Sequence, residues 1–161
     1  MMTQPSKEHE WLKRFVGEWR MEGECVMEPG KPPMKSGGTE KVRMLGDLWM
    51  IGEAVMEMPG GAGTMEAVMT LGFDPNKKKF VGTWIGAGMG TMFVYEGELD
   101  AAARVLPLNT SGPSMMDPTK VARYQDVVEL HDDNTRKLWS QMQDDKGAWH
   151  KFMSATYTRV K

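Results

Sequence analysis

The chain has little of several features that mark particular classes of protein. It holds one cysteine, Cys25, so no disulfide can form within it. No apolar run approaches the roughly 20 residues that a helix needs to cross a bilayer. The net charge is only -2, which lacks the basic character of nucleic-acid-binding proteins. We therefore expect neither a membrane span nor a nucleic-acid partner.

A secretory signal is also missing from the polar first residues, which have no basic segment followed by an apolar one. Together with the lone cysteine, this predicts a cytoplasmic protein. A secreted chain from which the signal had been removed would look similar.

Assembled catalytic and metal-binding motifs are absent as well. The histidines, His9, His131 and His150, do not have the spacing of a metal pair. No serine sits in a Gly-x-Ser-x-Gly elbow, and Cys25 has no identifiable basic partner. The glycine-rich run 86–90 is followed by a strand pattern, so it predicts a hairpin turn and no phosphate-binding loop. We predict no metal site and assign no catalytic residue, and an enzyme is the less favoured interpretation.

What is present indicates one domain over residues 1–161, with a tail at 1–5. The only helical pattern covers residues 6–17. Ser6 is its candidate N-cap, and its apolar stripe includes Trp11 and Phe15. Gly17 is the expected stop. So short a helix must dock on other elements, and we expect it to cap one end of a barrel.

The rest of the chain, residues 19–160, alternates short strands with turn signals. The expected strands cover residues 19–27, 39–44, 48–58, 65–73, 80–85, 91–99, 104–109, 121–130, 136–143 and 150–159. Residues 29–38 and 111–118 are expected loops. Short connections make neighbouring strands antiparallel, and closure removes the two exposed edges of an open sheet. The pattern predicts an all-β, up-and-down barrel of about ten strands, closed or nearly so, with room for a cavity.

Residues at the two ends of this pattern resemble those of the calycins, the superfamily of lipocalins and fatty-acid-binding proteins. Gly17 and Trp19 match the Gly-x-Trp motif at the entry to the first strand. The resemblance implies that Trp19 lies at the closed end, with Arg159 from the last strand packed across it. A guanidinium over an indole gains a cation–π contact and can also bond helix carbonyls.

A closer resemblance covers nearly the whole chain. The helix with the following Trp19, the segment 36–39 after the Pro/Gly loop, and the motifs at 45–49, 71–76, 79–84 and 157–159 are similar to the bacterial domain of unknown function family numbered 1579. The family has no established activity, so this resemblance implies a fold more than a function.

Several side chains are candidates for lining the cavity and binding a ligand. They are large, mostly apolar residues on the expected strands: Met69, Trp84, Phe93, Tyr95, Tyr124, Trp139, Met142 and His150. Alternation places Phe93 and Tyr95 on one face. Glycines beside Trp84 leave room for a flat ligand or mark a barrel corner. The 17 methionines fit either a plastic pocket or an ordinary core. Glu53 and Glu96 interrupt apolar stretches, and we expect them to point outward.

Four functions remain open. The leading hypothesis is a barrel that binds a small apolar or amphipathic molecule without a cofactor. An enzyme using interior polar residues such as Glu53, Tyr95, Tyr124 or His150 is an alternative. Haem binding through His150 is another, because this histidine loosely resembles the haem ligand of the nitrobindins. A homodimer through an outer sheet face is the fourth.

Overall fold

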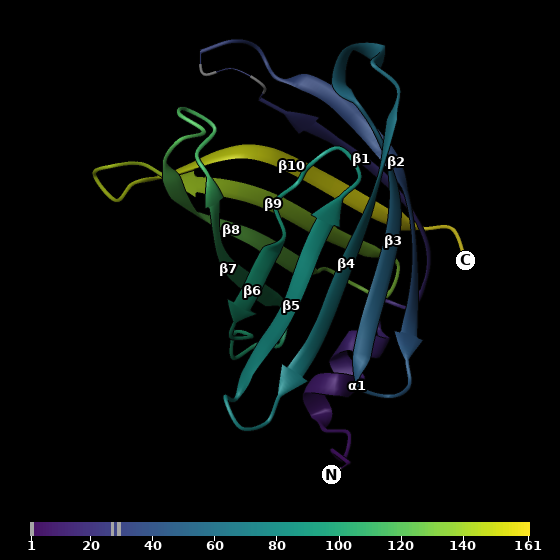
Figure 1. Cartoon of the computed structure of the whole chain (residues 1–161). Coiled ribbons are helices and arrows are strands. Elements are labelled where there is room, and N and C mark those ends of the chain that lie inside the picture. Colours follow the sequence, from purple (N-terminus) through teal and green to yellow (C-terminus); the bar gives the residue numbers. More distant parts are fainter. Residues whose placement is uncertain (1, 27, 29) are drawn as a thin grey trace.

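The structure is a computed structural model that describes residues 2–26, 28 and 30–161. The predicted end of the first strand at Met27 and the predicted start of the loop at Pro29 lie outside these residues. The described chain forms a closed antiparallel barrel in which each strand pairs with the next and the last pairs with the first (Figure 1). The predicted all-β barrel is confirmed.

Within the described residues, one short helix and ten strands make up this barrel. They are α1 (Lys7–Lys13), β1 (Gly17–Cys25), β2 (Met34–Leu45), β3 (Trp49–Glu57), β4 (Thr64–Asp74), β5 (Lys79–Gly86), β6 (Phe93–Gly97), β7 (Val105–Pro113), β8 (Val121–Leu130), β9 (Thr135–Gln143) and β10 (Trp149–Arg159), with one 3₁₀ turn, η1 (Pro59–Gly61). No helix in the described part of the chain is long and apolar enough to cross a membrane.

Several element boundaries differ from the sequence prediction by a few residues, and three of these differences have a clear cause. β2 begins at Met34, because residues expected to form a loop pair with β1 and β3 on either side. β7 continues to Pro113 through its ladder with β8. The helix proper ends at Lys13, and tighter turns follow, such as the bond from the Phe15 amide to the Leu12 carbonyl. Neighbouring strands thus supply hydrogen bonds that local composition does not reveal.

The helix closes the lower end of the barrel in Figure 1. Ser6 is its N-cap, and the His9 side chain completes the capping box in place of an acidic residue. Leu12 and Phe15 are 0% and 1% exposed, so the apolar stripe is fully docked. The Trp11 indole nitrogen donates to the Ala103 carbonyl at 2.8 Å, which ties the helix to the turn between β6 and β7.

The predicted pairing of Trp19 with Arg159 is present at this closed end. The Arg159 guanidinium carbon lies 4.3 Å from the centre of the Trp19 ring, and its nitrogens donate to the Val16 and Arg14 carbonyls. Gly17 has φ 138°, and a Cβ there would collide with Arg159. The motif Gly17–Trp19 therefore allows the chain to leave the helix beneath a packed guanidinium.

A buried ion pair lies just inside the same end. Glu40 of β2 accepts a hydrogen bond from Arg136 of β9, and these residues are 8% and 6% exposed. The Arg136 guanidinium carbon also lies 3.9 Å from the centre of the Tyr157 ring and 4.7 Å from that of Trp19. Aromatic faces thus surround the cation and replace part of its lost hydration.

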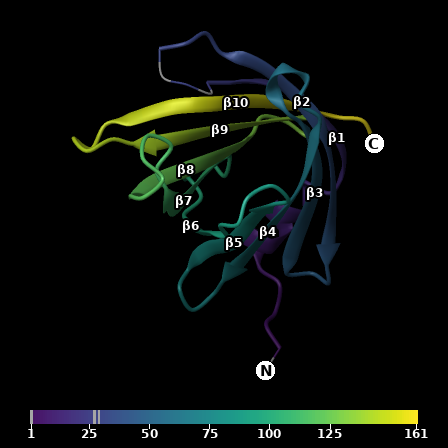
Figure 2. The same ribbon diagram turned by 45° about the horizontal axis from the view of Figure 1, so that its top comes forward.

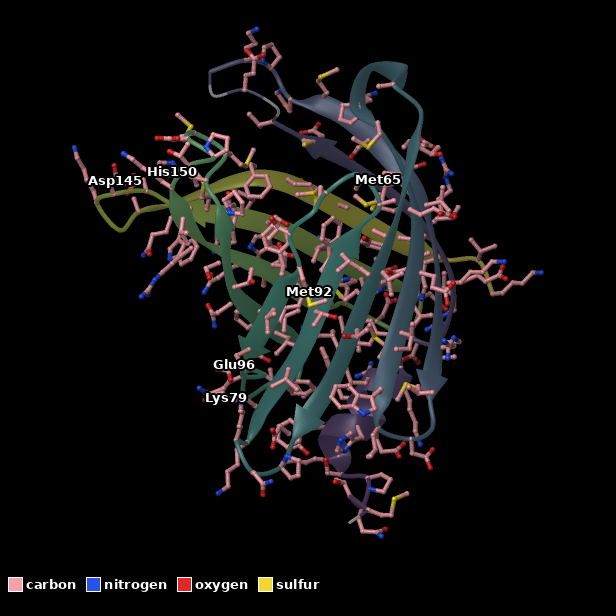
Figure 3. All side chains as sticks on the ribbon, in the orientation of Figure 1. Met65, Lys79, Met92, Glu96, Asp145 and His150 are labelled. Atoms are coloured by element: carbon pink, nitrogen blue, oxygen red, sulfur yellow. The ribbon has the colours of Figure 1, made fainter. Side chains whose placement is uncertain are left out.

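The outer face of the barrel is uneven in character. Around β1 and β2 it is charged, whereas β3 to β6 carry exposed apolar side chains such as Val55, Ile85 and Val94. Figure 3 shows Lys79 and Glu96 side by side beyond this apolar area, where their charged atoms are 3.8 Å apart. A homodimer formed through this apolar area stays a prediction. Analytical ultracentrifugation would test it by measuring the mass of the protein in solution.

Candidate functional site

The barrel has two unlike halves along its length. Next to the helix, inward side chains such as Leu71 and Phe80 are 1% exposed. Toward the opposite end, which comes forward in Figure 2, inward side chains such as Met56, Met69 and Met153 are only partly buried. Side chains that point into a closed barrel and still meet solvent indicate an interior that side chains do not fill. We call the inner surface of this open half the cup, and its residues are given below.

A row of aromatic rings crosses the cup from β5 to β10. Trp84 and Phe93 have centroids 6.0 Å apart, Phe93 and Tyr124 6.1 Å, and Tyr124 and Phe152 6.0 Å. A bulge between Lys151 and Met153 turns Phe152 toward this row. The row offers a continuous apolar wall with the ring edges and faces that flat or chain-like ligands contact.

Phe93 also seals the weakest seam in the barrel. The register pairs β6 with β7 only at Glu96 and Asn109. Inside the barrel, the Phe93 ring lies where a Cβ of Gly112 on β7 would be. Glycine at this position therefore lets the ring cover the seam from within.

The floor of the cup holds a polar cluster formed by three strands. The Tyr95 hydroxyl of β6 donates to one carboxylate oxygen of Asp126 on β8. The Ser140 hydroxyl of β9 donates to the other oxygen at 2.6 Å. Tyr95 and Ser140 are 1% and 5% exposed, whereas Asp126 keeps more accessible surface. The carboxylate is thus the member of the cluster that faces the hollow.

Burial shapes the acid–base behaviour of this cluster. Desolvation raises the pKa of Asp126, although the hydrogen bonds from Ser140 and Tyr95 work in the opposite direction. Desolvation raises the pKa of Tyr95 far above its usual value, and the adjacent Asp126 adds to the effect. Tyr95 therefore remains a neutral hydrogen-bond donor to the carboxyl group.

Two further polar groups lie closer to the mouth. The Tyr124 hydroxyl donates to the Pro113 carbonyl at 2.6 Å and accepts from the Met115 amide at 3.2 Å. It thereby fastens the loop that follows β7. On β7, the Thr110 hydroxyl is buried on the inner face without a hydrogen-bond partner among the described residues. Buried hydroxyl groups in folded proteins usually have a hydrogen-bond partner, so this position is an exception on the inner face.

Seven of the eight predicted lining residues hold inner-face positions in the register. They are Met69, Trp84, Phe93, Tyr95, Tyr124, Met142 and, at the end of β10, His150. Trp139 requires a correction. It pairs with Val127 and Ser154 on the outer face, and the Lys151 ammonium lies 4.8 Å from its ring centre. Alternation along β9 turns Trp139 outward because Leu138 and Ser140 point inward.

His150 also differs from the expectation of a lining residue. Its side chain is 62% exposed, and its Nε2 lies 2.7 Å from an Asp144 carboxylate oxygen in the hairpin between β9 and β10. Figure 3 shows it near Asp145 at the edge of the molecule. His150 pairs with Met142 in the register, but at the end of β10 its side chain bonds to the hairpin and lies mostly in solvent. Among the described residues, no group of three His, Cys, Asp or Glu side chains is arranged to hold a metal ion.

The structure also shows where the remaining residues discussed from the sequence lie, namely two glutamates, the cysteine and a glycine beside Trp84. Glu53 pairs with Arg43, and Glu96 with Lys77, all on the outer face as expected. Cys25 lies half-buried on the inner face, where desolvation raises the pKa of its thiol. The glycine at 86 does not leave free space, because the Trp84 ring and Met65 occupy it.

Sequence reasoning missed Asp126, Ser140, Glu40 and Arg136 as interior residues. A period-2 signal existed for each of them. Asp126 shares the parity of Tyr124 and Val128, and Glu40 shares that of Val42. The pattern was overlooked because charged residues in alternating strands usually mark the wet face.

Comparisons with known proteins agree with this architecture. No protein of curated function matches the chain. Among solved structures, Rv2717c from M. tuberculosis superposes with a TM-score of 0.67 at 11% identity, over 98% of this chain and 100% of that one. The S-type phycobiliprotein lyase CPES from Guillardia theta gives 0.63 at 10% identity, over 99% of each chain. A barrel titled EF1p2_mFAP2b bound to DFHBI gives 0.50 at 11% identity, over 94% of this chain and 98% of that one.

These identities are too low to transfer an activity, so the structural matches establish the shared barrel fold alone. The match to a family model is more specific. The model described as "Protein of unknown function (DUF1579)" spans residues 4–159, which includes the helix, all ten strands and the Trp19–Arg159 closure. The chain belongs to the DUF1579 family.

Proposed function

We propose that this protein binds a small apolar or amphipathic molecule inside the cup. The observation that carries the proposal is a contrast along the inner face: most inward side chains beside α1 are buried, whereas inward side chains toward the mouth such as Met56, Met69 and Met153 are partly exposed. Partly exposed methionines and aromatic rings adapt their shape to a ligand and gain free energy when it covers them. A phycobiliprotein lyase and a barrel bound to DFHBI among the similar folds support the same class of function.

Displacement of a neutral fluorescent dye tests the proposal. Nile red should brighten on binding to the purified protein, and decanol should displace it. Phe93→Ala removes part of the apolar wall and should weaken Nile red binding by about tenfold, which corresponds to the loss of roughly one aromatic contact. Val94→Ala is the matched control, because Val94 follows Phe93 on β6 but is 61% exposed on the outer face. The absence of dye uptake by the folded protein, or equal weakening in both variants, would contradict the proposal.

A second candidate, acid–base catalysis, is favoured by one observation. Tyr95, Asp126 and Ser140 bring titratable groups within hydrogen-bonding distance inside the barrel, and desolvation raises the pKa of Asp126. Mass spectrometry separates the two functions. A binding protein returns its ligand unchanged after incubation, whereas an enzyme returns a product that Asp126→Asn fails to form.

A further inference from the structure

Within the part of the chain that the structure describes, one acidic side chain inside the barrel has no basic side chain beside it. The charged side chains on the inner face of the described strands are Glu40, Arg136 and Asp126, with Arg159 at the closed end. Glu40 and Arg136 pair with each other, and Arg159 is bonded to backbone carbonyls of residues 14, 16 and 133. Asp126 has no lysine, arginine or histidine within ion-pair distance among the described residues.

Asp126 also has unused capacity to accept hydrogen bonds. A carboxylate offers about four acceptor positions, and the hydroxyls of Tyr95 and Ser140 occupy one on each oxygen. Tyr95 and Ser140 are fully buried, whereas Asp126 lies on the inner face and keeps some accessible surface, so its free acceptor positions are the ones a ligand inside the barrel would use.

The surroundings of Asp126 suit one end of an amphipathic molecule. On the adjacent strand, Leu108 is its cross-strand neighbour, and the unpartnered Thr110 hydroxyl lies one inward position closer to the mouth. Beyond them stands the aromatic row that begins at Tyr124. A ligand with its polar end on the floor would lay its apolar part along this wall.

We propose that the cup selects ligands whose polar end is a protonated amine or another N–H donor, with Asp126 as the acceptor. This inference rests on the proposed binding function and names its ligand class. A buried carboxylate attracts a cation strongly when the site excludes water, and it repels an anionic head. The barrel would therefore bind a cationic amphiphile in preference to a fatty acid.

A set of ligands with one tail and three heads tests this selection. Decylamine, decanol and decanoate should each be titrated at pH 7 against Nile red bound to the full chain. Decylamine should bind at least about tenfold more tightly than decanol, and decanoate more weakly than decanol. Asp126→Asn should remove the advantage of decylamine and leave decanol within about twofold.

Asp145→Asn is the matched control, because Asp145 lies exposed at the hairpin edge in Figure 3 and should retain the preference. Ser140→Ala is a second variant that keeps the carboxylate and frees an oxygen, so the amine preference should persist. Equal displacement by all three ligands, or tighter binding of decanoate, would overturn the inference while the binding function stands. Failure of every ligand to displace the dye would overturn the binding function itself.

Discussion

The two ends of this barrel are built from the same strands but differ in how tightly their inward side chains are packed. At the helix end, Trp19 is 1% exposed and lies beneath two guanidinium groups, and a buried ion pair fixes β2 against β9. At the other end, methionines and aromatic rings point inward and remain partly exposed. From this comparison we expect stability to be concentrated where the helix fills the barrel, which would leave the open half available for binding.

The largest effect is expected from breaking the buried pair. Arg136→Met leaves the Glu40 carboxylate buried without its partner, which should lower the free energy of unfolding by about 3–5 kcal/mol in urea titrations. The double variant Glu40→Gln/Arg136→Met should recover part of this loss. Lys79→Met is the control, because its pair with Glu96 is exposed and should cost less than about 1 kcal/mol. If Arg136→Met and Lys79→Met lower the free energy of unfolding equally, the buried pair contributes no more to stability than the exposed one.

A matched pair on β4 compares the two halves directly. Leu71 and Met69 share the inner face, but Leu71 is 1% exposed and Met69 is only partly buried. Leu71→Ala should cost about 2–5 kcal/mol because it leaves a cavity in a filled region. Met69→Ala should cost about 1 kcal/mol, since its side chain already meets solvent. If chemical unfolding gives equal losses, the open half is as tightly packed as the closed one.

The pH dependence of stability should report on Asp126. Desolvation raises the pKa of this carboxyl in the folded state, so the folded state holds the proton more firmly than the unfolded chain. The stabilising contribution is complete below the ordinary aspartate pKa and is lost as the pH rises through the raised value. Asp126→Asn has no such proton, so its stability relative to the wild type should increase with pH. Thermal unfolding between about pH 4 and 8 measures this, and a constant difference would contradict it.

The smallest effect is expected at the mouth. Tyr124→Phe removes the hydroxyl that bonds to Pro113 and Met115 but keeps the ring in the aromatic row. The free energy of unfolding should fall by about 1 kcal/mol. The Met115 amide should exchange with solvent faster, whereas the amide of Leu71 should not change. Hydrogen exchange followed by mass spectrometry tests this, and unchanged exchange at Met115 would show that other contacts hold the loop.

Local pattern was sufficient for most of the architecture. Alternation and turn signals predicted the strands, and short connections predicted their antiparallel order. Ser6, Gly17 and Trp19 marked the helix and its exit, since capping and a positive φ depend on a few adjacent residues. The predicted start of the second strand at residue 39 was wrong, because pairing with the neighbouring strands begins β2 at Met34.

The residues of the candidate site could not be identified from the sequence, because they meet through contacts between strands that are distant in the chain. Trp139 and Ser140 are adjacent in the chain, yet one lies outside the barrel and the other bonds to Asp126 within it. The chain by itself determined that a barrel with a capping helix forms, because periodicity and turns act over short distances. Only the tertiary structure decided which face each strand turns inward, since register is fixed by closure of the whole sheet, and a shift of one residue exchanges the inner and outer side chains.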